Sequence, residues 1–186
     1  MSGRAAQRIV LPGDPLVLEG TALRPWRDTD VDALVAACQD PEIARWTRIP
    51  VPYGPADARA YLRTRYDAAF AGLSAPFAIV ETGDGALLGS ITLLRVNWRH
   101  RRAMIGYWLA VPARGRGHAT RALRLASGWG MVALGLERIG LLAAVVNRGS
   151  QQVALRAGFR REAVLRSYLV SDGRRQDMVM FGLLSA

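Results

Sequence analysis

A glycine-rich hexapeptide, Arg114-Gly115-Arg116-Gly117-His118-Ala119, separates two stretches with different hydrophobic periods. Residues 104–111 before it are apolar and bulky and end at Pro112, which is typical of a buried strand. From Gly117 to about Leu134, the small and apolar residues return at helical spacing. The sequence therefore predicts a strand, a glycine-rich turn and a helix that begins in the turn.

A turn of this kind directs several backbone N–H groups at one point, at the positive end of a helix dipole. Gly115 and Gly117 permit positive φ and a close approach of the backbone to a ligand. Arg114 and Arg116 add positive charge. The turn and the first helical turn, through Thr120, therefore predict an anion site whose usual ligand is a phosphate.

Three phosphate-binding patterns can be compared with this segment. A P-loop needs a lysine, and the chain contains none. A dinucleotide fingerprint needs a third glycine, and Thr120 occupies that place. Arg114, Gly117 and Ala119 match Arg/Gln-x-x-Gly-x-Gly/Ala, which resembles the pyrophosphate loop of the GCN5-related N-acetyltransferases (GNAT), which bind acetyl-CoA. An ordinary glycine turn with solvated arginines is the alternative.

Length and composition favour one globular domain. Of the 186 residues, 51% are hydrophobic, enough for a sizeable core. We expect a flexible N-terminal arm over residues 1–14 and a single domain over 15–186. No apolar run reaches the roughly 18–20 residues of a membrane helix, and no signal peptide follows the N-terminus, so we expect a cytoplasmic protein. The single cysteine, Cys38, lies in an apolar helical pattern and is expected to be a buried core thiol.

The net charge is +10, and all 25 basic residues are arginines. This favours anionic partners such as the CoA phosphates, a ribosomal RNA surface or acidic substrates. The alternative is a general preference for arginine over lysine on solvated faces. His100 and His118 have no metal-ligand spacing, so no metal is expected, and both are expected on the surface or in loops.

The remaining elements follow from hydrophobic period and turn residues. Around the expected strand 104–111 and helix 117–134, the pattern predicts strands over 16–23, 76–81, 86–96, 139–146, 159–170 and 175–184. It also predicts helices over 31–38 and 56–70, a loop over 47–55, and a short helix over 151–157 that Ser150 caps.

This order of elements resembles the GNAT fold, an α/β (α+β) fold. The fold has a mixed central sheet of about seven strands, flanked by helices, in which a parallel pair splays apart. Here that pair is 104–111 and 139–146. The details most resemble the RimJ/RimL branch, which acetylates N-termini of ribosomal proteins but also contains enzymes for other amines. They are Ile105-Gly-Tyr-Trp-Leu109, Asn147 with Ser150, and Gly158-Phe-Arg-Arg-Glu162.

The resemblance also implies a set of cofactor contacts. The pantetheine arm would bind the main chain near Leu109, Ala110 and Val111, and the pyrophosphate would bind the amides of residues 114–119. Asn147 and Ser150 would lie near the thioester. Phe159 would pack beside the cofactor or, equally, in the core.

Acetyl transfer needs a neutral amine, a polarised carbonyl and a proton for the leaving thiolate. The resemblance makes Ser150 the first candidate for the proton donor and Tyr168 the second. The glutamates that serve as base in many relatives are absent here. Glu162 is the nearest alternative, although a structural salt bridge is the plainer interpretation, so we expect a water or the substrate to remove the proton. Trp46, with loop 47–55, would cover the acceptor site, and Tyr107 and Trp108 would line the cleft.

We therefore expect an acetyl-CoA-dependent N-acetyltransferase acting on a primary amine, either a protein or peptide N-terminus or a small-molecule amine, by direct attack in a ternary complex. Two alternatives stay open: a catalytically silent CoA-binding regulatory module, and a basic ribosome- or RNA-binding protein. The sequence names neither the acceptor nor the oligomeric state, although dimers occur in the RimJ/RimL branch.

Overall fold

The computed structural model describes residues 7–47, 49–171 and 173–185. Its strands are Leu16–Leu18 (β1), Thr21–Arg24 (β2), Ala75–Glu81 (β3), Leu87–Asn97 (β4), Arg102–Leu109 (β5), Arg138–Ala144 (β6), Arg160–Ser171 (β7) and Arg174–Leu184 (β8). They form one sheet in the order β1-β2-β3-β4-β5-β6-β8-β7, in which only β5 and β6 are parallel neighbours. The predicted mixed sheet with a single parallel pair is confirmed.

The sheet has eight strands where about seven were predicted. The expected first strand, 16–23, is divided into β1 and β2, which pair with each other as a hairpin. The division falls at Glu19 and Gly20, whose φ angles are 43° and 78°. Since extended backbone needs negative φ, these two residues form the turn.

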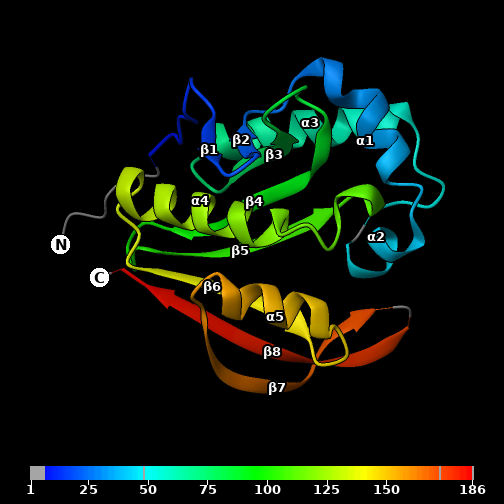
Figure 1. The fold of residues 1–186 in the computed structure, drawn as a ribbon. Coiled ribbons are helices and arrows are strands. Elements are labelled where there is room, and N and C mark those ends of the chain that lie inside the picture. Colours follow the sequence, from blue (N-terminus) through cyan, green and yellow to red (C-terminus); the bar gives the residue numbers. More distant parts are fainter. Residues whose placement is uncertain (1–6, 48, 172, 186) are drawn as a thin grey trace.

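The helices are Val31–Ala37 (α1), Pro41–Trp46 (α2), Pro55–Phe70 (α3), His118–Ala133 (α4) and Arg148–Arg156 (α5). In Figure 1, α4 and α5 lie in front of the sheet, while α1 and α3 lie behind its upper strands. Two hydrophobic clusters fill these layers. The larger lies between α4 and the sheet and includes Leu123, Phe77 and Ile139, and the smaller lies against α1 and α3 and includes Leu34, Leu62 and Trp26.

The parallel pair separates along its length. β5 and β6 are paired over four positions, from Arg102 opposite Arg138 to Ile105 opposite Leu141. Beyond that point β5 follows β4 as far as Leu109, while β6 follows β8 as far as Ala144. The main chain beyond Ile105 and Leu141 therefore has no strand partner across the gap. This is the splayed arrangement that the sequence resemblance implied.

Part of the segment before β1 contacts the end of α3. Residues 1–6 lie outside the described part of the chain, but Ile9 is buried in the larger cluster. The Ile9 N–H donates to the Ala69 carbonyl oxygen at 3.0 Å, and the Arg8 guanidinium stacks over the Phe70 ring. One apolar side chain thus anchors this segment at the end of α3, while the flexible arm over 1–14 stays a prediction.

A buried ion pair joins β2 to the turn before α1. The Arg24 guanidinium donates to both Asp30 carboxylate oxygens, at 2.8 and 2.7 Å, and the two side chains are only 9% and 7% exposed. The Arg27 N–H donates to Asp30 as well, at 2.8 Å. The hydrogen bonds that Arg24 donates to Asp30 raise the pKa of Arg24, although burial opposes the shift. A buried pair of this kind holds its segment in place as long as both partners are present.

Two further predictions concern single residues. Cys38 is a buried core thiol, as predicted, and burial raises its pKa to about 11. α5 begins at Arg148 and is capped by Asn147, so the prediction that Ser150 caps a helix over 151–157 is wrong. Among the described helices, none has the length and apolar character needed to cross a membrane.

Candidate active site

The glycine-rich turn lies between a 3₁₀ turn, Val111–Ala113, and the start of α4. Gly115 and Gly117 have φ angles of 76° and 82°, the left-handed conformation that the sequence predicted for this turn. The first N–H to bond back into the helix is that of Arg121, which donates to Gly117 at 3.2 Å. Within the described chain, the six amides of residues 115–120 have no acceptor. They can therefore bind a diphosphate at the positive end of α4.

Arginine side chains hold this turn from outside. Arg121 donates to the Thr21 hydroxyl at 2.9 Å and to the Arg116 carbonyl oxygen at 2.7 Å. The Arg116 guanidinium lies 3.6 Å from Glu81 in an exposed pair. Arg114 donates to the Leu109 carbonyl oxygen at 3.0 Å and pairs with Asp40. The turn is thus fixed to β2, β3 and the start of α2, while its amides stay available.

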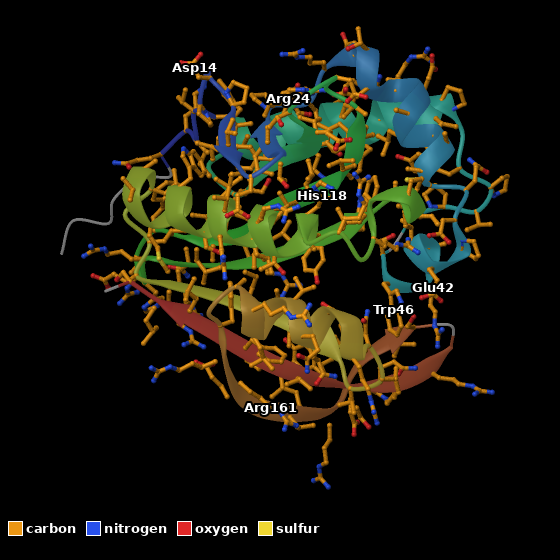
Figure 2. All side chains as sticks on the ribbon, in the orientation of Figure 1. Asp14, Arg24, Glu42, Trp46, His118 and Arg161 are labelled. Atoms are coloured by element: carbon orange, nitrogen blue, oxygen red, sulfur yellow. The ribbon has the colours of Figure 1, made fainter. Side chains whose placement is uncertain are left out.

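His118 differs from its predicted place on the surface or in a loop. The residue is 3% exposed, and its Nδ1 lies 2.9 Å from the Thr21 hydroxyl oxygen. Figure 2 shows His118 in the interior of the molecule. Burial, together with the charges of Arg121 and Arg116, lowers the pKa of the imidazole. Only the His118 amide therefore belongs to the predicted anion site, because the first turn of α4 packs its side chain against β2.

Part of the main chain at the end of β5, where the pantetheine contacts were predicted, is hydrogen-bonded within the protein. The Leu109 carbonyl oxygen accepts from Arg114, and the Ala110 N–H donates to Leu88 at 2.9 Å. Among the three predicted residues, the Val111 amide has no acceptor in the described chain. The Val111 N–H is thus a main-chain donor available to a ligand there, in addition to the Leu109 N–H, which the β4–β5 register turns toward the gap between β5 and β6.

Two cavities meet where β5 and β6 separate. The smaller, about 220 Å³, is lined by Leu109 and Arg114 and by residues of α2 and α5. The larger, about 290 Å³, extends beneath α3 and is lined by Tyr61 and Arg65. Five residues line both cavities: Trp46, Tyr107, Trp108, Asn147 and Ser150. The structure thus brings together, at one junction, five residues that the sequence analysis selected.

Ser150 is held at this junction by two neighbours. Its N–H donates to the Asn147 side-chain oxygen at 3.0 Å, which also caps α5. Its hydroxyl oxygen accepts from the Tyr107 hydroxyl at 3.1 Å. Burial raises the pKa of Tyr107, and the hydrogen bond to Ser150 lowers it to a smaller extent. The phenol therefore keeps its proton at neutral pH and leaves the Ser150 proton free to be donated elsewhere.

Trp46, the last residue of α2, forms one wall of both cavities. Its indole N–H donates to Glu42 at 3.0 Å, and the Arg45 guanidinium stacks on its ring. Ser171, at the end of β7, donates to the Arg45 carbonyl oxygen at 3.0 Å. Figure 2 shows Trp46 and Glu42 together on α2. The wall is thus built from two segments that are far apart in the sequence.

Three predicted residues lie away from the junction. Phe159 is buried in the larger core cluster, which is the second of the two roles considered for it. Glu162 pairs with Arg138 through both carboxylate oxygens, and these hydrogen bonds lower its pKa. Tyr168 is 45% exposed, beside the irregular stretch of β7 at Ser167. Neither Glu162 nor Tyr168 lines the cavities.

α3 and β4 contribute residues to the site that the sequence did not predict. Tyr61 and Arg65 line the larger cavity together with Ser90 and Thr92, and the Tyr61 and Ser90 hydroxyl oxygens are 3.1 Å apart. The spacing of Tyr61 and Arg65 places both on one helix face, which could have pointed to them. Arg65 is the only charged residue in the described lining of this cavity, which holds no carboxylate and no histidine.

Comparison with known proteins assigns the family. Residues 21–160 match the model of the acetyltransferase (GNAT) domain. A Bacillus subtilis protein that bears the name "Putative ribosomal N-acetyltransferase YdaF" is 38% identical over 108 residues, which are 56% of this chain and 59% of YdaF. The spermidine N(1)-acetyltransferase of Escherichia coli is 28% identical over 125 residues, 67% of either chain.

Among solved structures, Mycobacterium smegmatis RimJ in complex with CoA-disulfide superposes with a TM-score of 0.82. It is 27% identical to this chain, and the match covers 92% of this chain and 86% of RimJ. The free amides of the glycine-rich turn fit the diphosphate of such a ligand. The chain therefore belongs to the GNAT family and is an N-acetyltransferase that uses acetyl-CoA.

Proposed function

We propose that the protein acetylates a primary amine, at a polypeptide N-terminus or on a small molecule, by direct attack in a ternary complex. The observation that carries this proposal is the meeting of the two cavities at Tyr107, Trp108 and Ser150. A cosubstrate in the smaller cavity and an acceptor in the larger can then approach each other within reacting distance.

The cysteine and the serine both argue against a covalent acetyl-enzyme. Cys38 is the only cysteine, is buried, and lines neither of the two cavities. Ser150 would need a base beside it to act as a nucleophile, and its hydroxyl neighbour is instead the proton donor Tyr107. Transfer straight to the acceptor amine is the simpler chemistry for this site.

Ser150 supplies the proton for the departing sulfur in this proposal. Acetyl-CoA provides an activated thioester acetyl group when it is bound. Because Asn147 fixes the Ser150 backbone and Tyr107 donates to its oxygen, the Ser150 O–H can point into the junction. Tyr107 then replaces the proton that Ser150 gives up, and water in the cavity, which has received the proton of the acceptor amine, returns a proton to Tyr107.

The acceptor amine loses its proton without a dedicated carboxylate or histidine, since the described lining of the larger cavity holds neither. An α-amino group has a pKa of about 8, so about a quarter of it is already neutral at pH 7.5. A water hydrogen-bonded to Ser90, Thr92 or Tyr61 can accept the remaining proton. A polyamine acceptor is disfavoured, because its several ammonium groups would face Arg65 rather than carboxylates.

The test is release of CoA from acetyl-CoA with peptides and small amines as acceptors. Intersecting double-reciprocal plots are expected for a ternary complex, and parallel plots would contradict it. Ser150→Ala should lower turnover by about 10²–10⁴-fold. Ser127→Ala is the matched control, because Ser127 is buried in α4 and lines neither cavity. Unchanged turnover in Ser150→Ala would remove Ser150 as the proton donor.

A further inference from the structure

A third cavity lies on the same sheet as the larger cavity of the junction, which is about 290 Å³, and adjoins it. This arginine cavity, about 330 Å³, has Met104, Gly140 and Met180 in its lining, together with Arg95, Arg102 and Arg138. The arginine cavity lies at the N-terminal end of β5. The larger cavity lies toward the C-terminal end, where β5 separates from β6.

Strand register shows that the two cavities adjoin. Leu94 of the larger cavity is paired across strands with Met104 of the arginine cavity. Leu142 of the larger cavity is likewise paired with Met180. The two cavities therefore form one groove along the strands, which we call the acceptor groove.

The acceptor groove has an apolar floor, and α3 borders it at the end where Tyr61 and Arg65 lie. Leu94, Met104, Leu142 and Met180 are each half-buried, and none of them belongs to either hydrophobic cluster of the described chain. Gly140 lies between the methionines, and a Cβ there would stand 2.7 Å from the Met104 sulfur. Glycine at this position keeps the floor low enough for another backbone to lie on it.

The charges along the acceptor groove indicate which kind of polypeptide it can bind. Arg65 stacks on Tyr61, and its Nε is buried without a hydrogen-bond partner in the described structure. Arg95 and Arg102 are exposed and have no carboxylate within ion-pair distance among the described residues. Arg138 is neutralised by Glu162. The groove thus presents three unpaired arginines, and its described lining has no carboxylate.

We infer that the acceptor groove binds the first residues of a polypeptide acceptor in extended conformation, and that it selects chains with acidic side chains near the N-terminus. This inference rests on the proposed function. The four steps along β5 from Gly106 to Arg102 span about 13 Å at about 3.3 Å per residue, so an extended acceptor covers the same distance in about four steps. With its amine at Ser150, acidic side chains at positions four to six lie beside Arg95 and Arg102, and an earlier one lies beside Arg65.

The test compares three eight-residue peptides that differ only at positions four to six, which are aspartate, asparagine or lysine. Two readouts are taken: kcat/KM from CoA release, and Kd by calorimetry with CoA-saturated enzyme, which needs no turnover. The aspartate peptide should be favoured about tenfold over the asparagine peptide in both, because charge pairs form with Arg95 and Arg102. The preference should shrink as salt is raised.

Arg95→Asn with Arg102→Gln should reduce the aspartate-to-asparagine ratio to near one. Asparagine is chosen for position 95 because Arg95 has a φ of 52°, which asparagine tolerates. Arg102→Gln alone, which changes no unusual backbone angle, should reduce the ratio partly. The matched control is Arg99→Gln, an exposed arginine of the β4–β5 turn outside the groove, and its ratio should equal that of the wild type.

Equal values for the aspartate and asparagine peptides would overturn the inference while leaving the proposed function intact. So would an equal loss in Arg99→Gln, which would indicate only the overall charge. A polyuridine oligonucleotide that binds the same arginines more tightly than the aspartate peptide would overturn it as well. Selective peptide binding without turnover of any amine would instead refute the proposed function and support the groove.

Discussion

Replacing Gly117 with alanine tests the anion site most directly, because this residue combines two properties. Its φ of 82° is left-handed, and it immediately precedes the amides that open α4. For an L-residue that conformation costs about 1–2 kcal/mol. An added Cβ would also lie 2.7 Å from a guanidinium nitrogen of Arg121, the side chain that holds the Arg116 carbonyl oxygen.

The 1–2 kcal/mol must appear in one of two places. If the turn keeps its shape, the folded state carries the strain, and the melting temperature falls by about 2–4 °C per kcal/mol. If the turn relaxes, the amides leave their positions, and the Kd for CoA rises by about 5–30-fold. Thermal unfolding of Gly117→Ala measures the loss of stability, and calorimetry measures the loss of CoA affinity. Expressed as free energies, the two losses should add up to about 1–2 kcal/mol.

Gly128→Ala is the matched control, since Gly128 lies in the same helix with a helical backbone and open space around its Cβ position. It should stabilise the protein by about 1 kcal/mol and leave the Kd for CoA unchanged. A Gly117→Ala protein with wild-type values for both quantities would refute our account of the turn.

Three further predictions concern named contacts. Asp30→Asn should lower the free energy of unfolding by about 3–5 kcal/mol, because it leaves Arg24 buried and unpaired. Glu137→Gln, in the exposed pair with Arg101, should change the free energy of unfolding by less than about 1 kcal/mol. Urea titration of both variants measures the difference. Burial lowers the pKa of His118, so below a pH of about 6.5 the unfolded chain binds a proton at this residue that the folded chain does not bind. The free energy of unfolding should therefore fall with decreasing pH by up to about 1.4 kcal/mol per pH unit. His118→Gln should flatten that dependence. Tyr107→Phe should reduce kcat about three- to tenfold by removing the donor to Ser150, and a wild-type kcat in stopped assays of CoA release would show that Ser150 does not need it.

Much of the fold was predictable because its signals are local. The glycines of the hexapeptide, the apolar strand before it and the period of the helix after it specify the β5–α4 unit with little help from the rest of the chain. The predicted strand over 139–146 and β6 differ only at their ends, where hydrophobic period is least informative.

What the sequence did not indicate depends on packing between distant segments. His118 is buried because α4 lies on β2, nearly a hundred residues away in the chain. Asn147 rather than Ser150 caps α5, and both are good capping residues, so tertiary contacts decide between them. The acceptor groove exists because α1 and α3 cover only part of their face of the sheet, and the hydrophobic period of the sequence does not indicate which part stays open.

Four paired positions hold the two halves of the sheet together, with β1 to β5 on one side and β6 to β8 on the other. A ligand bound in the opening between β5 and β6 would contact both halves and so link them further. A ligand that binds only the folded form, at a concentration of a hundred times its Kd, raises the free energy of unfolding by about 2.7 kcal/mol. Amide hydrogen exchange along the four-residue seam should therefore slow when CoA is present, even though the ligand touches none of those amides.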